Sequence, residues 1–387
     1  MRDKSLISDV TINFVDSIDK VKLCSWNDLT PSHSPLFQHQ FFSILEKSQS
    51  VSAKQGWQAH HLLATSNDEL IAVMPMYLKS HSWGEYVFDW TWAEAYQGNG
   101  LAYYPKLVAT IPFTPITSNK LVSSKLKMHE LFSPLIKHCN QNDIHSWHIL
   151  YCEALNEPLP EQVFQRNTVQ FHWFNHDYQT FDDFLSRFTS RKRKNTLKER
   201  LSIAQQGIKI RQLKNDEISQ QDLAFFYLTY QLTYLKRGHQ PHLSFNFFQQ
   251  LVAEKSNNVL LNIASTENED IACAFFIYDE QQLYGRYWGC TKPYRNLHFE
   301  LCYYQGIDFC INNKIKYFNP GTQGEHKIQR GFEPVLTYSY HWVKHPAFQS
   351  AIKEFCKHEQ QHMLMYQQEC RQMLPFKRSD NEANSNQ

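Results

Sequence analysis

A short polar segment, Gly321–Gly331, carries side chains whose types fit acyl transfer to an amine. It places an acid, an imidazole, two cations and two amides directly after an apolar run that predicts a strand. Amine acylation needs a base that takes the proton of the ammonium group, and donors that hold the developing oxyanion. We expect Glu325 or His326 to act as this base. The residues expected to hold the donor or the acceptor are Gln323, Lys327 and Arg330.

The position of this segment favours a functional role. Ligands of α/β sheets gather at the carboxyl ends of strands, and loops on a rigid scaffold are where function concentrates. The alternative is a solvated loop whose charged residues form ordinary salt bridges.

A second set of polar residues lies on a predicted helix at about 298–313. Glu300 and Tyr304 share one helix face at i, i+4, and Tyr303 lies beside them. With Arg286 on the preceding predicted strand, they form either the wall of a substrate pocket or a buried network that stabilises the fold. In the pocket reading, Tyr304 or Tyr303 acts as an acid, and Glu300 and Arg286 bind substrate.

Two acids stand among aromatic residues in the first half of the chain, Glu85 and Asp89. Burying a carboxylate is costly unless the group is paired. We expect these acids either to form structural pairs with a cation such as Lys106 or Arg286, or to line a cleft. In the cleft, Asp89 and Lys106 bind the substrate.

A dense basic run lies near the middle of the chain, within a helical stretch predicted over 181–206. Positions 191, 194 and 198 form one stripe of that helix. The run is either a solvated interdomain helix or a site for phosphate, carried by tRNA or by a nucleotide-linked substrate. Few aromatic residues are interleaved, so sequence-specific base reading has no support. The basic residues are Arg191, Lys192, Arg193, Lys194, Lys198 and Arg200.

The sequence His358-Glu359-Gln360-Gln361-His362 matches H-E-x-x-H, which on a helix can bind zinc. Met365 and Gln368 stand where a third histidine is spaced in one such family, and the segment lies on a polar C-terminal helix. We therefore expect no metal site and do not favour zinc proteolysis.

Composition narrows the class of protein further. The chain has 387 residues, 42% of them hydrophobic, and a net charge of +1. A domain holds roughly 100–200 residues, so we expect two domains. A neutral chain has no global attraction to nucleic acid, and no DNA partner is expected. The nine cysteines form no C-x-x-C pair, and neither a leader nor a membrane span is found, which predicts a cytoplasmic protein with reduced thiols.

An internal repeat predicts how the chain is organised. The segment at 64–72 resembles 264–272, Trp83-Gly84-Glu85-Tyr86 resembles Tyr284-Gly285-Arg286-Tyr287, and the pair Phe41-Phe42 resembles Phe247-Phe248. Three matches in the same order indicate a duplication. Each copy predicts a helix, a hairpin, a third strand that carries the aromatic-Gly element, a long helix and a last strand. The fold class is α+β, with two tandem lobes and mixed sheets flanked by helices.

The expected domain boundaries follow from this repeat. We predict a first lobe over 1–175, a basic interdomain helix over 176–207 and a second lobe over 208–345. A C-terminal helix and a disordered tail occupy 346–387.

Several stretches resemble the Fem-type peptidyltransferases, which are paired GNAT-like domains, and above all the FemAB-like group of peptidoglycan biosynthesis or recognition proteins. The resemblance extends from about Leu36 to Phe376. It implies two GNAT-like lobes and an N-acyltransferase that moves an acyl or aminoacyl group from acyl-CoA or aminoacyl-tRNA to a small-molecule or peptide amine, linked to peptidoglycan precursors. No tightly bound cofactor is implied. The stretches that carry it are 84–90, 103–107, 112–117, 190–195, 284–290, 298–305 and 324–327.

The GNAT resemblance also implies where acyl-CoA would bind. The pyrophosphate-binding turn should fall at 295–300, where His298 and Glu300 occupy the two glycine positions. Side chains there crowd the backbone amides, which disfavours acyl-CoA, whereas the basic run favours aminoacyl-tRNA as donor. The alternative to an enzyme is a non-catalytic module that recognises a peptide or cell-wall precursor on the same fold.

Overall fold

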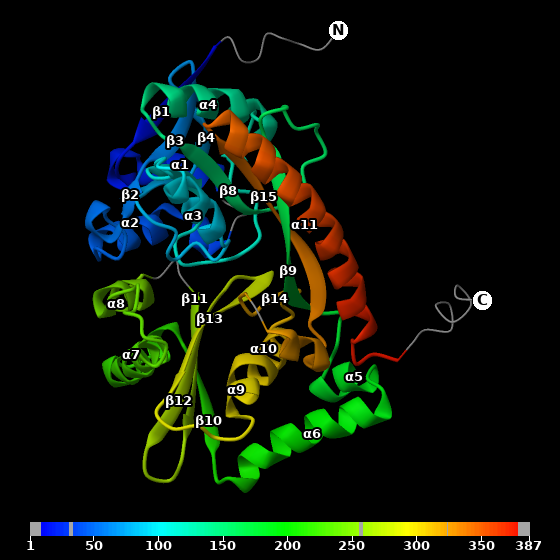
Figure 1. Ribbon diagram of the computed structural model, residues 1–387. Helices are drawn as coiled ribbons and strands as arrows, with labels where there is room; N and C mark the ends of the chain where they lie inside the picture. Colours follow the sequence, from blue (N-terminus) through cyan, green and yellow to red (C-terminus); the bar gives the residue numbers. More distant parts are fainter. Residues whose placement is uncertain (1–8, 31–33, 255–257, 323, 378–387) are drawn as a thin grey trace, which may run out of the picture. The chain divides into compact units, whose positions relative to one another are not determined.

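The computed structural model describes residues 9–30, 34–254, 258–322 and 324–377 (Figure 1). These residues form two compact units. The first unit contains the described residues up to Thr168, together with His242–Phe247 and Leu336–Leu364. The second contains Val169–Pro241, Phe248–Val335 and the described residues from Met365 onward. Within the described residues, no helix is both long enough and apolar enough to cross a membrane.

The first unit is built on two sheets. One has the strand order β1-β3-β4-β7, and the other contains β15, β8, β6, β5 and β2 in that order. β6 and β8 are parallel, whereas β2–β5, β5–β6 and β15–β8 are antiparallel, so this sheet is mixed. The elements are β1 (Val10–Val15), α1 (Leu23–Leu29), α2 (His39–Lys47), β2 (Trp57–Ala59), β3 (His61–Ser66), β4 (Glu69–Met74), β5 (Met76–Lys79), α3 (Trp90–Gly98), β6 (Lys106–Ala109), β7 (Val122–Ser123), α4 (Phe132–Gln141) and β8 (Ser146–Cys152).

The second unit contains the strands β10, β11, β12, β13 and β14 in spatial order, followed by the end of β9. β13 and β14 are parallel and the other neighbours are antiparallel. The elements are α5 (Phe181–Ser186), α6 (Ser190–Gln205), β10 (Lys209–Lys214), α7 (Gln220–Leu235), β11 (Asn258–Ser265), β12 (Asp270–Tyr278), β13 (Gln282–Cys290), α9 (Leu297–Phe299), a π-helical turn (Glu300–Tyr304), α10 (Gln305–Asn312), β14 (Tyr317–Asn319) and the 3-10 helix η7 (Glu325–Arg330).

Four elements contain residues of both units: β9 (Phe164–Phe174), α8 (Phe245–Ala253), β15 (Glu333–Val343) and α11 (Pro346–Gln372). All nine cysteines are free thiols.

Strand register confirms the duplication of the hairpin. In the first unit β1 pairs with β3, and β3 with β4; in the second unit β10 pairs with β11, and β11 with β12, all antiparallel. Ala64 faces Ala72 and Ala264 faces Ala272, and the register shifts directly after Ala64 and directly after Ala264. The same irregularity at the same repeat position shows that the two hairpins are equivalent.

The prediction for the third strand of the first unit was wrong. Trp83-Gly84-Glu85-Tyr86 lies in turns between β5 and α3, and β6 is the strand that pairs with both the hairpin strand β5 and the last strand β8. Gly84 has φ of 83° and Tyr86 has φ of 61°, left-handed values that an extended strand does not allow. The equivalent Tyr284-Gly285-Arg286-Tyr287 does lie on a strand, β13.

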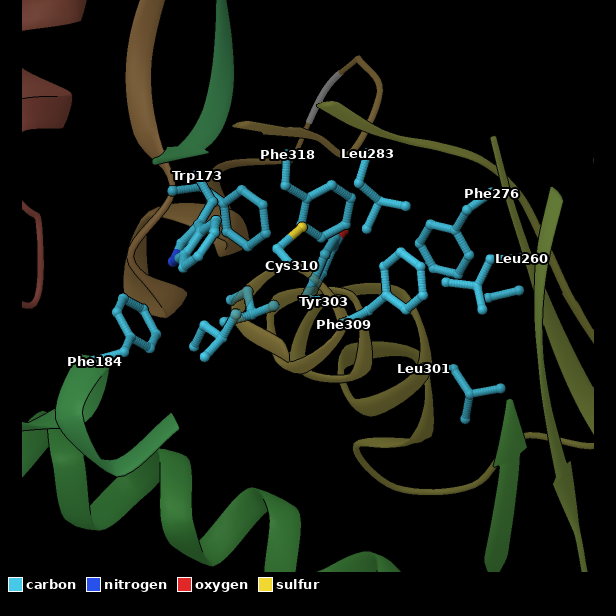
Figure 2. Close-up of a cluster of buried hydrophobic side chains, with 14 of the residues drawn as sticks. Trp173, Phe184, Leu260, Phe276, Leu283, Leu301, Tyr303, Phe309, Cys310 and Phe318 are labelled. Carbon is cyan, nitrogen blue, oxygen red and sulfur yellow. The ribbon is translucent and has the colours of Figure 1, made fainter. Parts of the chain in front are cut away.

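Helices pack on both faces of the second unit's sheet. Successive residues of a strand point to opposite faces. Phe276 of β12 contacts Phe318 beside α10, whereas the preceding Phe275 contacts Phe226 of α7. The α10 side holds an apolar cluster (Figure 2), which includes Tyr303 and Leu301 of the π-helical turn. The turn that carries candidate site residues is therefore anchored in the core.

Close packing of α7 on β13 leads to a stability prediction. A Cβ atom at Gly289 would lie 2.0 Å from the carbonyl oxygen of Thr229, so no side chain fits without separating helix and strand. We expect Gly289→Ala to lower the free energy of unfolding by about 1–3 kcal/mol or more, as overpacked core substitutions do. Gly98→Ala is the matched control, because nothing lies within 4 Å of its Cβ position. Equal urea midpoints for the two variants would contradict the packing argument.

Candidate functional site

Glycine geometry shapes the polar loop that follows β14. Gly324 and Gly331 flank η7 with φ of 103° and 82°. A Cβ atom at Gly324 would lie 2.4 Å from the His326 ring, and one at Gly331 would lie 2.8 Å from the Phe184 ring. Both positions therefore require glycine. Gln323, a predicted substrate-binding residue, lies outside the described residues.

His326 is the exposed titratable group at the centre of this loop. Its Nε2 lies 2.8 Å from the hydroxyl of Tyr303. The ring also packs beside His298 and Phe299, with centroids 5.9 Å and 5.6 Å away. Partial burial, followed by the charges of Lys327 and Arg330, lowers the pKa of His326 below its usual 6.5. The imidazole is therefore neutral at pH 7 and able to accept a proton.

Lys327 points into the protein and stabilises the loop from its buried side. Its Nζ donates to the carbonyl oxygens of Gly321, at 2.7 Å, and Thr322, at 3.2 Å. The residue is 2% exposed, and burial lowers the pKa of its ammonium to about 7. Among the described residues, Lys327 bonds only to carbonyl oxygens and has no paired carboxylate. When protonated, it therefore provides positive potential beside His326.

Arg330 is held in place by a carboxylate from α6. Its Nη2 donates to both oxygens of Glu199 at 2.8 Å, and its Nη1 donates to the backbone oxygen of His326 at 2.7 Å. The guanidinium carbon lies 3.4 Å from the Phe299 ring centroid. Tyr304 donates its hydroxyl proton to the same Glu199. The arrangement fixes the backbone at His326.

The tyrosines differ in what they contact. Tyr303 reaches His326, whereas the Tyr304 hydroxyl is committed to Glu199. Burial raises the pKa of both phenols well above 10. Tyr303 is thus the tyrosine in contact with the candidate base, and Tyr304 supports Arg330 through their shared carboxylate.

Glu300 and Arg286 do not meet. Glu300 accepts from Arg200 of α6 at 3.1 Å and from Gln305 at 2.8 Å. Arg200 also donates to Asp308 at 2.6 Å. Arg286 lies over the Tyr287 ring, with its guanidinium carbon 5.1 Å from the centroid. The buried Glu300 therefore forms part of a network that attaches α6 to α10.

Glu325 lies at the edge of the loop. It is exposed, and its Oε1 accepts from the hydroxyl of Tyr366 on α11 at 2.7 Å. Glu325 contacts α11 but neither Tyr303 nor Arg330, so it does not belong to the group around His326. Of the two candidate bases, His326 has the environment of a base.

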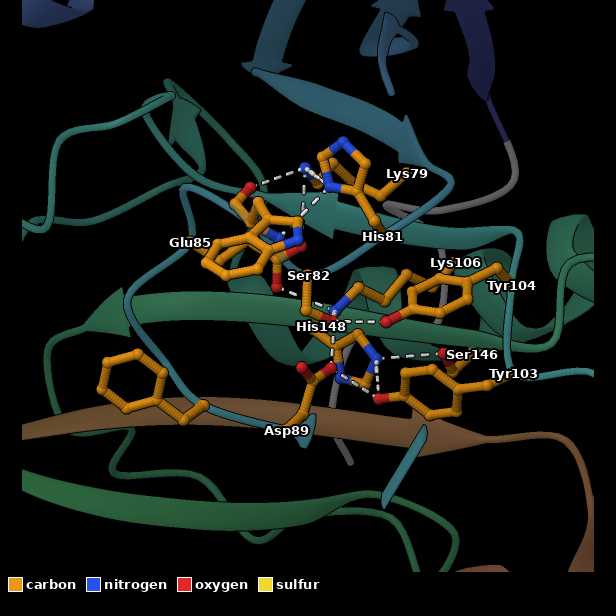
Figure 3. Close-up of polar contacts among 12 residues, drawn as sticks. Lys79, His81, Ser82, Glu85, Asp89, Tyr103, Tyr104, Lys106, Ser146 and His148 are labelled. Carbon is orange, nitrogen blue, oxygen red and sulfur yellow. Dashed lines mark hydrogen bonds and ion pairs between the residues drawn. The ribbon is translucent and has the colours of Figure 1, made fainter. Parts of the chain in front are cut away.

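A second polar cluster lies inside the first unit, centred on Lys106 of β6 (Figure 3). Lys106 Nζ donates to Asp89 Oδ2 at 2.5 Å, to Glu85 Oε2 at 2.8 Å and to Ser82 Oγ at 2.8 Å. Burial opposes ionisation of Asp89, but Lys106 outweighs it and holds the pKa of that carboxyl below its usual range. The structural pairing expected for Asp89 and Lys106 is present, and both side chains are buried.

Lys79 is the second buried lysine of this cluster. It is fully buried, and its Nζ lies 3.4 Å from the Trp57 ring centroid and 3.8 Å from Glu85 Oε1. Burial lowers the pKa of Lys79 to about 6. At neutral pH the cluster therefore has one firmly charged lysine, Lys106, facing Glu85 and Asp89.

Two buried imidazoles, His148 (Figure 3) and His341, extend the cluster. The Tyr103 hydroxyl donates to Asp89 Oδ2 at 2.6 Å and lies 3.2 Å from His148 Nε2. His148 Nδ1 lies 2.8 Å from His341 Nδ1. Burial lowers the pKa of His148 to about 3, so the ring stays neutral. The network ties β6, β8 and β15 together through polar contacts inside the core.

The H-E-x-x-H segment is occupied by a structural contact. Both carboxylate oxygens of Glu359 accept from Arg166, at 2.6 Å and 2.8 Å. Among the described residues, no group of three or more His, Cys, Asp or Glu side chains is placed to hold a metal ion.

The sequence offered signals for two residues that were not assigned to the loop. Glu199 is the single acid of α6, inside a strongly basic run, and a lone acid in such a run points to a buried cationic partner. Tyr303 is one of the two tyrosines predicted to act as an acid, but no contact with His326 is predicted for it. Neither contact could be paired from sequence, because Glu199 and Arg330 are 131 residues apart.

The architecture defines the class first: an α+β protein of two compact units, built on mixed sheets with flanking helices. Solved structures with this arrangement include the C-terminal domain of a putative lysylphosphatidylglycerol synthetase from Agrobacterium fabrum. It has 7% identity and a TM-score of 0.51, and the match covers 87% of this chain and 95% of that one. A conserved protein of unknown function from Bacteroides thetaiotaomicron has 12% identity and a TM-score of 0.51, with 86% and 100% covered.

The family follows from a direct sequence match. The model of the FemAB-like family, described as peptidoglycan biosynthesis/recognition, matches residues 17–378. The chain belongs to this family. A search of curated proteins found no match.

Proposed function

We propose that this FemAB-like protein is an N-acyltransferase that moves an acyl or aminoacyl group from an activated donor to the amine of a peptidoglycan precursor. The observation that carries the proposal is the neutral, exposed imidazole of His326, held against Tyr303 beside the buried cations Lys327 and Arg330. A base next to positive charge is what amine attack on a carbonyl requires. We take a peptidoglycan precursor as the acceptor because the family is described by peptidoglycan biosynthesis/recognition.

The proton path starts at the acceptor ammonium. In the tautomer that carries its proton on Nε2, His326 donates to the Tyr303 oxygen, and Nδ1 is left to take the proton. The amine then attacks the donor carbonyl, and the carbon–nitrogen bond forms as the donor's carbon–oxygen or carbon–sulfur bond breaks. The leaving alcohol or thiol takes a second proton from the attacking nitrogen. Lys327 and Arg330 contribute positive potential where the oxyanion develops, and Glu199 and Tyr304 keep Arg330 in position.

The contacts at the turn 295–300 favour aminoacyl-tRNA over acyl-CoA as the donor. At the turn where GNAT enzymes bind pyrophosphate, the Glu300 side chain is 3% exposed and paired with Arg200. The turn is also covered by α6, because Asn296 donates to Ser202 Oγ at 3.0 Å and Gln206 donates to the Arg295 oxygen at 3.1 Å. These contacts compete with phosphate for the turn.

Ligand-dependent melting tests the proposal. A ligand that binds only the folded state raises the melting temperature according to its concentration over its Kd. We expect nucleotide-linked muropeptides and aminoacyl-tRNA to raise it, and acetyl-CoA to have no effect. A higher melting temperature with acyl-CoA alone would indicate acyl-CoA, not aminoacyl-tRNA, as the donor. An unchanged melting temperature with all of these ligands would contradict the transferase proposal.

The pKa of His326 gives a further prediction. We expect proton NMR to place it below 6.5, because burial and two cations disfavour the charged ring. Since the folded protein then binds this proton more weakly than the unfolded chain, the linked stability is lost as pH falls from 6.5 toward the folded pKa. The His326→Gln variant assigns the resonance by its absence. A pKa above 6.5 would contradict the electrostatics of the site.

A further inference from the structure

Helix α6, which is green in Figure 1, combines exposed basic side chains with exposed large apolar ones. Leu197 is 44% exposed and Leu201 is 56% exposed, although both are leucines on a helix whose buried positions are Thr196 and Ile203. Exposed basic residues surround the two leucines: Arg191, Arg193, Lys194 and Lys198.

Helical spacing places these residues together. At 3.6 residues per turn, Leu197 and Leu201 lie one above the other at i, i+4, and so do Lys194 and Lys198. The two pairs are neighbours on the surface opposite Thr196 and Ile203. The result is a narrow apolar ridge with lysines along it.

No acid lies on this face. The single acid of α6, Glu199, is turned toward Arg330 and Tyr304. In the described part of the chain, the side chains of Arg191, Arg193, Lys194 and Lys198 form no hydrogen bond or ion pair. Among the described residues, therefore, no partner has to be displaced before a ligand contacts these charges.

We propose that this face of α6, defined by Leu197, Leu201, Lys194, Lys198, Arg191 and Arg193, docks on an anionic phospholipid surface. Leucines that enter the headgroup boundary, flanked by cations that meet lipid phosphates, are the features of an interfacial helix. A nucleic acid would use the cations but has no use for an exposed leucine pair. The inference does not depend on the proposed transferase activity.

Vesicle sedimentation of the full chain tests this docking. We expect the protein to pellet with vesicles of phosphatidylglycerol and phosphatidylcholine, to remain in solution with phosphatidylcholine alone, and to be released by added salt. Lys194→Glu/Lys198→Glu should weaken binding by at least about 30-fold. Lys22→Glu/Lys54→Glu makes the same change in net charge at exposed lysines outside α6, and should bind as the wild type does.

The leucines separate a membrane from a polyanion. Leu197→Ser/Leu201→Ser should weaken vesicle binding by about tenfold or more, and should leave binding of total tRNA in a filter assay unchanged. Failure of the wild type to pellet with anionic vesicles, or full binding by the leucine variant, would overturn the proposal. Tight tRNA binding that only the lysine variant loses, without vesicle binding, would assign the face to nucleic acid instead.

Discussion

Replacing Lys106 by methionine is expected to lower the free energy of unfolding by about 3–5 kcal/mol, because it leaves buried carboxylates without their cation. Lys106 is fully buried and bonds to both Asp89 and Glu85, at 2.5 Å and 2.8 Å. Lys79 is no equivalent substitute, since its Nζ is 3.8 Å from Glu85 and burial disfavours its charged form. Chemical denaturation at pH 7 measures the loss.

Two comparisons isolate the charge effect at Lys106. Lys127→Met breaks an ion pair with Glu157 whose lysine is 68% exposed, and should leave the urea midpoint nearly unchanged. Adding Glu85→Gln and Asp89→Asn to Lys106→Met removes the uncompensated charges and should recover much of the loss. If Lys106→Met were no worse than Lys127→Met, the cluster would not be the electrostatic core of the first unit.

His326→Ala is expected to lower kcat by roughly 10²–10⁴-fold, the usual contribution of a positioned general base. KM should change far less, because the loss lies in the transition state. His326 is exposed, so added imidazole should restore part of the rate. Steady-state kinetics with the donor and acceptor found by ligand-dependent melting provides the measurement.

The control for His326 is a histidine with no role in the loop. His358 is 70% exposed on α11, near Glu354, and His358→Ala should retain the full rate. Tyr303→Phe should lose activity, whereas Tyr304→Phe should mainly destabilise Arg330. Wild-type kcat in His326→Ala would rule out this residue as the base.

Local patterns explain why the repeat was readable from the sequence. The turn residues between β3 and β4, and between β11 and β12, match in type, and both hairpins shift register after the equivalent alanine. The prediction of the third strand of the first unit was wrong because residue types do not reveal the backbone conformation. Gly84 and Tyr86 adopt positive φ in a turn, whereas Gly285 in the similar sequence lies within β13.

The site was only partly predictable for a related reason. A polar loop after a strand can be predicted from its residue types, and the pairing of Lys106 with Asp89 and Glu85 follows from the cost of burying unpaired acids. Contacts between segments that are distant in the sequence cannot be predicted in this way. Glu199 joins Arg330 and Tyr304, and Arg200, not Arg286, meets Glu300, because α6 packs against the π-helical turn.

Product mass spectrometry tests the central claim most directly. The purified chain is incubated with aminoacyl-tRNA or acyl-CoA and a nucleotide-linked muropeptide, and the acceptor is examined for the mass of one added acyl group. The account predicts an amide product with wild type and His358→Ala and almost none with His326→Ala. Saturable binding of the muropeptide without any acylated product, from either donor, would contradict catalysis and identify the chain as a recognition protein.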